Sequence, residues 1–267
     1  MTDLNQAVIV ITGATGGFGR QLTRQLLQAG SCLILSDIDR TTLEEFAAKI
    51  KTEVTTGEII ACLESDLSLP ESSQNLYDRI KALGRPVDIL INNAGIALLG
   101  RMNDVTTEKW EKLMQINLLA PMRLSSLYIN DAIERRKGHI VNISSVAGWI
   151  GAWGMASYNA SKFGLRGFSE GLFNDVKKYN IKVTVVYPFF SRTPILESER
   201  FGMAKKAGGL PDRLVTDPAK VMERTIKGIV ADKFHVFPDR YAKSLYILKQ
   251  YFPGLLDWIT NRTTKKN

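Results

Sequence analysis

The sequence predicts an α/β protein in which helices cover both faces of a parallel sheet. Seven short apolar runs, rich in Val, Ile and Leu, alternate with stretches of helical periodicity. The runs lack a strict polar–apolar alternation, which is typical of strands buried on both faces. Such strand–helix alternation indicates a doubly wound sheet. Folds of this kind and of this length, 267 residues, often form one domain, so we predict a single domain over residues 1–267.

The predicted elements follow one another along most of the chain. The strands span 7–12, 31–36, 59–63, 89–92, 140–143, 183–186 and 235–237. The helical patterns span 17–29, 41–52, 71–83, 106–135, 156–179 and 217–231. Between the last two, residues 191–216 carry mixed charge, paired glycines and two prolines. Long irregular segments in compact domains are commonly lids or binding loops, so we expect a substrate lid here.

The composition excludes several protein classes. With 45% hydrophobic and 23% charged residues and a mean hydropathy of −0.07, the chain is neither disordered nor a membrane bundle. Only two cysteines are present, and both lie in apolar runs, where buried free thiols are expected. The first apolar run is too short for a secretory signal, and the uncharged stretch 138–161 is too polar to span a bilayer. These features predict a cytoplasmic protein.

Positive charge is concentrated near the C-terminus. The net charge is +8, and residues 218–267 hold ten Lys or Arg against four acidic residues. The excess can attract an anionic surface, or it can simply mark a solvated helix face and tail. No nucleic-acid motif accompanies it, so we expect no nucleic-acid partner. The extension 240–267 is aromatic and basic, and it either lies on a membrane surface or, as we favour, packs over the substrate cleft or a neighbouring subunit.

A glycine-rich loop connects the first predicted strand to the first helix. It reads Thr12-Gly13-Ala14-Thr15-Gly16-Gly17-Phe18-Gly19. Glycines allow a tight turn and close approach to a pyrophosphate, and the helix N-terminus supplies amide donors. No Lys-Ser/Thr pair follows, which excludes a P-loop. The loop therefore predicts a dinucleotide site with contacts from Gly13, Thr15, Gly17, Phe18 and Gly19.

An acidic residue at the end of the second strand indicates which dinucleotide binds. Asp37 stands 24 residues beyond Gly13, where a carboxylate can accept the ribose hydroxyls and repel a 2′-phosphate. We therefore predict NAD rather than NADP. Two observations weigh against this: Asp37 could instead cap the helix before Thr41, and Arg40 could support NADP.

Several further motifs then follow in a recognisable order. They are Asn92-Asn93-Ala94-Gly95, Ser145, Tyr158-x-x-x-Lys162 and the Pro188…Thr193 stretch. Together with the glycine loop they resemble the short-chain dehydrogenase/reductase family over residues 7–193. The resemblance implies a Rossmann-like, seven-stranded parallel sheet. It also implies cofactor contacts from Asp66, Leu67, Asn93, Ala94, Gly95, Tyr158, Lys162, Pro188 and Thr193.

The pair Tyr158 and Lys162 makes chemical sense without the family. Residues at i and i+4 share one face of a helix. A phenol with a reference pKa of about 10 is a poor acid–base group at neutral pH. One ammonium at about 4 Å, at an effective dielectric near 20, supplies roughly the 4 kcal/mol needed to lower that pKa by about 3 units. We therefore expect Lys162 to lower the pKa of Tyr158, which would then move the substrate's hydroxyl proton.

Two more catalytic residues are implied by the resemblance. Ser145, or its neighbour Ser144, would hold the substrate oxygen beside Tyr158, and the family spacing favours Ser145. Asn117 matches an asparagine that bends a helix and holds a water beside the lysine, although without the family it is only a polar helix residue. No metal is needed for this chemistry. We interpret His139 and His235 as structural.

The substrate side is expected to be apolar. Candidate walls are Ile96–Leu99, Trp149, Ile150, Trp153, Met155, Phe189, Phe190, Ile195 and Leu196. They suit a lipophilic alcohol or ketone, although the two tryptophans could equally pack in the core or an interface. Arg192 is the one cation among these stretches. Phe189 stands where the family usually has glycine, so its ring needs another place.

These features predict an NAD(P)-dependent oxidoreductase that interconverts an alcohol and a ketone or aldehyde. An idle dinucleotide-binding regulator or scaffold is the alternative, which the intact Asn117, Ser145, Tyr158 and Lys162 oppose. A sugar-nucleotide epimerase would need a longer C-terminal domain.

A stripe of small residues also predicts an oligomer. Ser157, Ala160, Gly164, Gly167 and Gly171 fall within about 80° of helix surface, away from the catalytic face. This stripe either packs on the chain's own 106–135 helix or, as the resemblance implies, joins helices 106–135 and 156–179 of two subunits into a homodimer or homotetramer.

Overall fold

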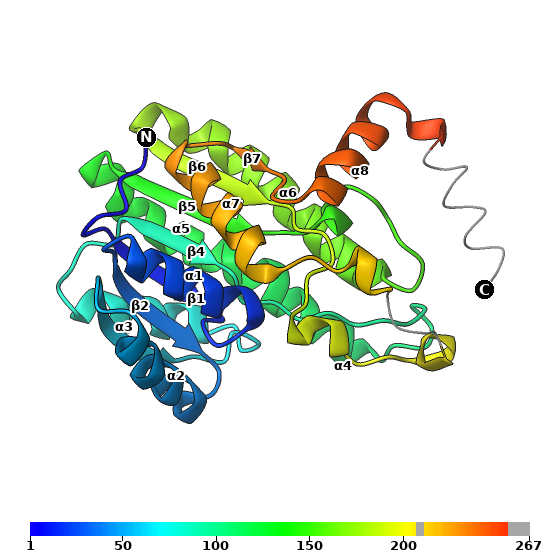
Figure 1. Ribbon diagram of the computed structural model, residues 1–267, viewed down its shortest axis with the longest axis horizontal. Helices are drawn as coiled ribbons and strands as arrows, with labels where there is room; N and C mark the ends of the chain where they lie inside the picture. The colour runs from blue at the N-terminus through cyan, green and yellow to red at the C-terminus, as the bar shows by residue number, and fades with distance from the viewer. Residues whose placement is uncertain (207–210, 256–267) are drawn as a thin grey trace.

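The described part of the chain, residues 1–206 and 211–255 of a computed structural model, contains one sheet of seven parallel strands (Figure 1). Its order is β3-β2-β1-β4-β5-β6-β7, so the winding direction changes between β1 and β4. The strands are β1 (Val8–Thr12), β2 (Cys32–Asp37), β3 (Glu58–Glu64), β4 (Ile89–Asn92), β5 (Gly138–Ile143), β6 (Ile181–Val186) and β7 (His235–Val236). The predicted doubly wound sheet is confirmed.

Helices cover both faces of this sheet. Core clusters place α1 (Gly17–Gln28), α2 (Arg40–Glu53) and α7 (Pro218–Val230) on one face, and α3 (Ser72–Ala82), α5 (Ala120–Arg135) and α6 (Ala156–Val176) on the other. The predicted helix 106–135 is divided into α4 (Thr107–Met114), a π-helical turn (Gln115–Leu119) and α5. The division coincides with Asn117, whose side chain bonds outside the helix.

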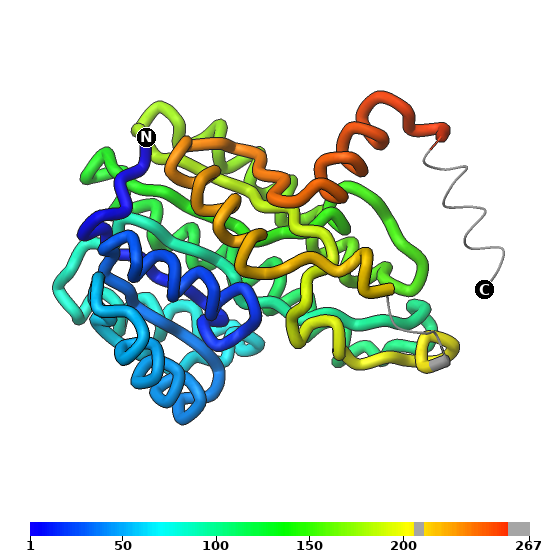
Figure 2. The backbone as a smooth tube through the Cα atoms, viewed as in Figure 1, coloured from blue at the N-terminus to red at the C-terminus, as the bar shows by residue number. Residues whose placement is uncertain are grey.

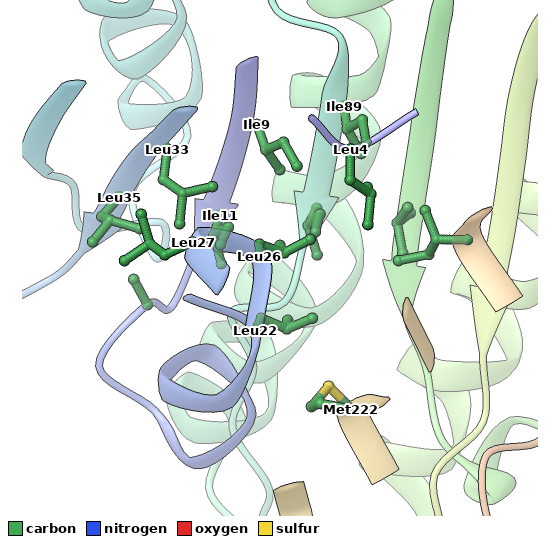
Figure 3. Packing of buried hydrophobic residues seen from close by; sticks show 14 of the residues in the cluster. Leu4, Ile9, Ile11, Leu22, Leu26, Leu27, Leu33, Leu35, Ile89 and Met222 are labelled. Atoms are coloured by element: carbon green, nitrogen blue, oxygen red, sulfur yellow. The ribbon is translucent and has the colours of Figure 1, made fainter. Parts of the chain in front are cut away.

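The two faces are built from alternate residues of the same strands. In β1, Ile9 and Ile11 pack toward α1 and α7, whereas Val8 and Val10 pack toward α3 and α5. Figure 3 shows the first of these cores, where side chains of α1 and α7 meet those of β1 and β2. All four β1 side chains are at most 5% exposed. Burial on both faces explains why the sequence shows apolar runs instead of an alternating pattern.

Two segments lie outside the sheet and its covering helices: the expected lid and the C-terminal helix. The expected lid, residues 191–216, is irregular with short 3₁₀ turns, and its residues 207–210 lie outside the described part. The last described helix, α8 (Arg240–Tyr251), extends away from the sheet (Figure 2). The rest of the expected C-terminal extension, residues 256–267, also lies outside the described part. Among the described helices, none has the length and apolarity needed to cross a membrane.

Candidate active site

The predicted site residues gather at the carboxyl edge of the sheet. The glycine loop follows β1, Asp37 ends β2, Asn93 follows β4 and Ser145 follows β5. The winding direction changes between β1 and β4, and open α/β sheets bind ligands outside the strand ends at such a point. A cavity of about 320 Å³ lies elsewhere, between α3 and α5. None of the predicted site residues lines it.

The glycine loop is packed too tightly for side chains. Gly13 has φ +65°, and a Cβ there would lie 2.8 Å from the Ala94 Cα. A Cβ on Gly19 would lie 2.1 Å from the Gly13 carbonyl oxygen, and one on Gly17 would lie 2.3 Å from the Thr193 Cγ2. No side chain caps the start of α1. The loop therefore presents bare backbone and a helix N-terminus, which fit a dinucleotide pyrophosphate.

The turn after β4 holds this loop in place. The Asn93 Nδ2 donates to the carbonyl oxygens of Thr12 and Gly13, both at 2.9 Å. The Thr12 Oγ1 accepts from the backbone N–H groups of Asn93 and Ala94, both at 3.1 Å. The Asn93 side chain is thus occupied in joining β1 to β4, which makes it a positioning residue for the glycine loop.

Asp37 bonds to the glycine loop and does not cap a helix. Its Oδ2 accepts from the backbone N–H and the hydroxyl of Thr15, at 2.8 and 2.7 Å. The residue that caps α2 is Asp39, which accepts from the Thr42 N–H at 2.6 Å. The helix-cap alternative for Asp37 is therefore wrong. Arg40 is exposed and paired with Glu44 at 2.8 Å.

Three further predicted cofactor residues follow the carboxyl ends of β3 and β6, on opposite sides of the sheet centre. Asp66 follows β3, and its Oδ1 accepts from the Ser68 N–H at 2.9 Å. Leu67 is 7% exposed and packs in the core beneath α3. The carbonyl oxygen of Pro188, after β6, accepts from the Val146 N–H at 3.1 Å. These contacts hold the segments after β3 and after β6 at the carboxyl edge of the sheet.

Tyr158 and Lys162 lie one turn apart on α6 and are almost fully buried. The Lys162 Nζ is 5.7 Å from the centre of the Tyr158 ring and donates to the Ile143 carbonyl oxygen at 2.9 Å. Burial raises the pKa of Tyr158 to about 12, against a smaller opposite effect of a hydrogen bond to Ser145. Burial lowers the pKa of Lys162 to about 8. The expected lowering of the phenol pKa is therefore wrong in direction, because the effect of burial outweighs that of the hydrogen bond to Ser145.

The structure distinguishes Ser145 from Ser144. The Ser144 hydroxyl is buried and donates to the Lys162 carbonyl oxygen at 3.1 Å, so it braces α6. The Ser145 hydroxyl accepts from the Ala147 N–H at 3.1 Å and also forms the hydrogen bond with Tyr158. Ser145 is thus the serine beside the phenol, in agreement with the family spacing.

Asn117 is fully buried in the π-helical turn. Its Oδ1 accepts from the Ile96 N–H and its Nδ2 donates to the Ile96 carbonyl oxygen, both at 2.9 Å. The Nδ2 also contacts the Ser161 hydroxyl at 3.2 Å, which connects the turn to α6. A Cβ on Gly95 would lie 3.3 Å from the Asn117 Oδ1 and 3.6 Å from the Lys162 Nζ. Gly95 therefore leaves room next to both groups.

An apolar cluster surrounds Tyr158. It is built from Ile96, Ala97, Leu98, Val105, Trp110, Leu113, Met114, Ala147, Met155, Ile195 and Phe201. Three of the predicted wall segments contribute to it, namely the one after β4, the one before α6 and the lid. Arg192 points away, 72% exposed and paired with Asp212 at 3.2 Å.

The two predicted wall tryptophans do not join this cluster. Trp149 is 9% exposed and packs edge-on against Tyr187 and Tyr246, with ring centres 5.7 and 4.9 Å apart. The Arg166 guanidinium covers its face at 3.3 Å. Trp153 is 40% exposed. The wall interpretation is therefore wrong for Trp149, which belongs to the core as the alternative proposed, and Trp153 lies at the surface.

The ring of Phe189 turns toward α8. It packs against Phe190 at 4.8 Å and Tyr241 at 5.4 Å between ring centres. The Phe189 N–H donates to the Asp239 Oδ2 at 2.9 Å, and the Asp239 Oδ1 accepts from the Ala242 N–H at the start of α8. One buried carboxylate thus fixes both the end of β6 and the first turn of α8.

The expected lid is attached at both ends and in the middle. The Ser191 and Thr216 hydroxyls lie 2.7 Å apart at its base. Leu99 and Arg200 form a bridge, where the Phe201 N–H donates to the Leu99 carbonyl oxygen at 2.7 Å. These contacts bring the lid over the apolar cluster that contains Tyr158.

Sequence reasoning missed two positioning residues. One is Asp239, although an aspartate before a helical run is a recognised N-cap signal. The other is Asn159, whose Nδ2 donates to the carbonyl oxygens of Ala147 and Ile150 at 2.7 and 2.9 Å. The only sign in the sequence was an asparagine directly after Tyr158, which could donate hydrogen bonds to the backbone carbonyls of the loop after Ser145.

A family model of the short chain dehydrogenases matches residues 7–203, which include the glycine loop, Ser145, Tyr158, Lys162 and Thr193. The chain is a short-chain dehydrogenase/reductase. It is therefore a member of an oxidoreductase family, and the resemblance in the motifs is confirmed. The observed seven-stranded sheet agrees with this assignment.

Related proteins cover most of this short-chain dehydrogenase/reductase. Epidermal retinol dehydrogenase 2 of Homo sapiens is 33% identical over 256 residues, 93% of this chain and 80% of the relative. The 3-ketodihydrosphingosine reductase of Bos taurus is 32% identical over 230 residues, 85% of this chain and 68% of the relative. A short-chain dehydrogenase from Sphingobium yanoikuyae, solved in complex with NADPH, aligns with a TM-score of 0.80 at 28% identity, covering 94% of this chain and 95% of that one.

Proposed function

We propose that this protein is an NAD(P)-dependent oxidoreductase that interconverts a lipophilic alcohol and the corresponding ketone or aldehyde. The observation that carries the proposal is the group formed by the buried Tyr158 and Lys162 and the half-buried Ser145, with an apolar cluster packed around Tyr158. Polar acid–base groups in apolar surroundings suit a substrate with one reactive oxygen on a hydrophobic body. Arg192, the one cation within the predicted wall stretches, pairs with Asp212 at the surface and offers no carboxylate or phosphate anchor in the site.

The chain's own residues account for the movement of the proton. Because burial keeps the pKa of Tyr158 at about 12, its phenol is protonated at neutral pH and is a proton donor to a carbonyl oxygen. Ser145 holds that oxygen beside the phenol. The Lys162 ammonium stabilises the phenolate left after the transfer, and Asn117 fixes the turn beside it. A bound nicotinamide dinucleotide supplies or accepts the hydride.

The residues present fit such a dinucleotide. Side-chain-free positions at Gly13, Gly17 and Gly19 leave the backbone accessible to a pyrophosphate. Asp37, at the end of β2, supports NAD because its carboxylate would repel a 2′-phosphate, and Arg40 is engaged by Glu44. The related Sphingobium protein was solved with NADPH, so the preference of this chain for NAD is our proposal.

Two of the relatives support the same substrate class. One is named 3-ketodihydrosphingosine reductase and the other epidermal retinol dehydrogenase 2. We infer from these names that the substrate here carries a ketone or an alcohol group on an apolar body. The apolar cluster around Tyr158 supports a substrate of this type here.

Replacing Tyr158 with phenylalanine tests the proposal. We expect Tyr158→Phe to lower turnover of lipophilic ketones and secondary alcohols by about a thousandfold, because the proton donor is removed and the ring is kept. NADH binding, followed by fluorescence, should stay unchanged. Tyr179→Phe, an exchange outside the site, should behave as the wild type. Unchanged turnover in Tyr158→Phe contradicts the mechanism, and a wild type that binds NADH but turns over no carbonyl favours the idle regulator.

We further propose that helices 106–135 and 156–179 join two subunits in a homodimer or homotetramer. The chain's own packing explains only part of the small-residue stripe, since a Cβ on Gly164 would lie 2.8 Å from Leu118. A Cβ on Gly167 or Gly171 would have nothing within 4 Å. These two positions leave a flat helix surface that a second helix can approach closely.

A further inference from the structure

Helix α8 buries little of its surface, and apolar side chains are exposed toward and just beyond its C-terminal end. Of its 12 residues only Ala242 is buried, whereas the 13-residue α7 buries five. Eleven large hydrophobic side chains are exposed in the described part of the chain, and four of them lie in α8 or within four residues of its end. These four are Ile247 (41%), Tyr251 (68%), Phe252 (58%) and Leu255 (49%), and we call them the α8 apolar surface.

The opposite side of α8 is firmly attached to the protein. Tyr246 stacks on Phe237 with ring centres 4.4 Å apart and meets Trp149 at 4.9 Å. Tyr241 packs on Phe189, and Asp239 caps the helix from a buried position. The helix is therefore held rigidly while it projects from the body (Figure 2). An attached helix that carries exposed aromatic side chains at its projecting end offers an apolar surface for contact with another body.

The charge around the α8 apolar surface indicates what this surface binds. Residues 240–255 contain three basic residues, Arg240, Lys243 and Lys249, and no acidic residue. Lys243 is exposed. A second copy of this helix would bring like charges together. An anionic lipid headgroup layer attracts them instead, and it accommodates Tyr and Phe side chains at its interface.

We propose that the α8 apolar surface docks this protein on an anionic lipid bilayer. Its position also relates to the active site, because the Tyr241 hydroxyl donates to the carbonyl oxygen of Arg213 in the lid at 2.6 Å. Docking would therefore bring the lid region close to the bilayer. A lipophilic substrate would then be available where it is dissolved; this consequence rests on the proposed function, whereas the docking surface does not.

The lid and the two segments packed with it also carry exposed apolar side chains. The segments around residues 100, 154 and 201 meet through the bond from the Gly100 N–H to the Gly154 carbonyl oxygen and through the bridge from Leu99 to Arg200. They carry three more of the exposed apolar side chains, Met102 (47%), Trp153 (40%) and Met203 (48%). Seven of the eleven exposed large hydrophobics of the described chain thus belong to the α8 apolar surface, to the lid or to the two segments that pack with the lid.

Vesicle sedimentation of the full chain, without substrate or cofactor, tests the docking. We expect the wild type to pellet with phosphatidylserine–phosphatidylcholine vesicles at about 0.1 M salt, and much less at about 1 M salt or with pure phosphatidylcholine. The double variant Tyr251→Ser/Phe252→Ser should bind at least about tenfold more weakly, and Lys243→Glu should also weaken binding. Leu69→Ser, which removes an exposed apolar side chain far from α8 in the sequence, is the matched control and should pellet like the wild type.

Thermal unfolding should show that all four proteins are equally folded, because the changed side chains are exposed. Light scattering of the same samples separates docking from self-association. Absence of pelleting with anionic vesicles at low salt overturns the proposal, as does equal pelleting of the double variant. If the double variant dissociates into smaller particles while its vesicle binding is unchanged, the α8 apolar surface binds a second copy of the chain. That result also overturns the proposal. Because the assay needs no catalysis, its result is independent of the activity measurements.

Discussion

Replacing Lys162 with methionine should make the protein more stable and much less active. The Lys162 side chain is 5% exposed, and burial lowers its pKa from 10.5 to about 8. This difference corresponds to about 3 kcal/mol of stability lost at pH 7, where both states carry the proton. Methionine has a similar length and no charge. After subtracting about 1 kcal/mol for the lost bond to the Ile143 carbonyl oxygen, we expect a net gain of about 2 kcal/mol.

The loss of activity follows from the position of the same charge. The Lys162 Nζ lies 5.7 Å from the centre of the Tyr158 ring. At an effective dielectric of about 20, an ammonium at that distance stabilises a phenolate by about 3 kcal/mol. Since in the proposed mechanism the phenolate forms as Tyr158 gives up its proton, Lys162→Met should slow carbonyl reduction by about 100-fold.

The stability gain should depend on pH in a defined window. Below pH 8 both the folded and the unfolded wild type hold the Lys162 proton, and the full cost of burying the charge is present. Between pH 8 and 10.5 the unfolded state binds the proton and the folded state has released it, so wild-type stability recovers as the pH rises. The difference between variant and wild type should therefore shrink through this window.

Calorimetry and initial rates measure both effects on the same samples. A gain of about 2 kcal/mol corresponds to about 4 °C in Tm for a chain of this size. Lys177→Met, a change at an exposed lysine beyond the end of α6, should alter neither quantity appreciably. A Lys162→Met protein that melts at a lower temperature than the wild type, or one that retains its rate within about threefold, refutes this reasoning.

Three further changes address the cofactor and the assembly. Gly17→Ala places a Cβ 2.3 Å from the present Thr193 Cγ2 and should weaken NADH binding by about tenfold in a fluorescence titration, whereas Gly151→Ala, with nothing within 4 Å, should not. Asp37→Ala should weaken NAD by about tenfold and reduce the discrimination against NADP in steady-state kinetics; a wild type that prefers NADP contradicts the cofactor assignment. Gly167→Leu should dissociate the oligomer in light scattering, and a wild type that is monomeric at micromolar concentration ends that proposal.

The sequence was informative where one residue type satisfies one local demand. Apolar runs predicted the strands because both faces of this sheet are buried, as Val8–Ile11 show. The glycine loop could be predicted because backbone must approach backbone at Gly13 and Gly19. The spacing of Tyr158 and Lys162 placed them on one helix face, where the structure has them. Each of these demands acts within a few residues, which is why spacing alone reveals it.

Properties that depend on distant partners could not be predicted in the same way. The pKa of Tyr158 was expected to fall, because its neighbour Lys162 is visible in the sequence and the burial that raises it is not. Trp149 was expected to line the substrate site, but its partners Tyr187 and Tyr246 are 38 and 97 residues away. The same limit applied to the helix 106–135, which Asn117 interrupts by bonding to Ile96.

The replacement of the family glycine by Phe189 is understandable only through such distant partners. A phenylalanine at this place needs a site for its ring, and α8 provides one through Tyr241. The backbone of Phe189 keeps a fixed position because Asp239 accepts its N–H, and the same carboxylate starts α8. Thr193, four residues later, still packs against the glycine loop at Gly17. The ring of Phe189 therefore contacts the C-terminal helix while Thr193 stays against the glycine loop, so the end of β6 and α8 act as one structural unit in this protein.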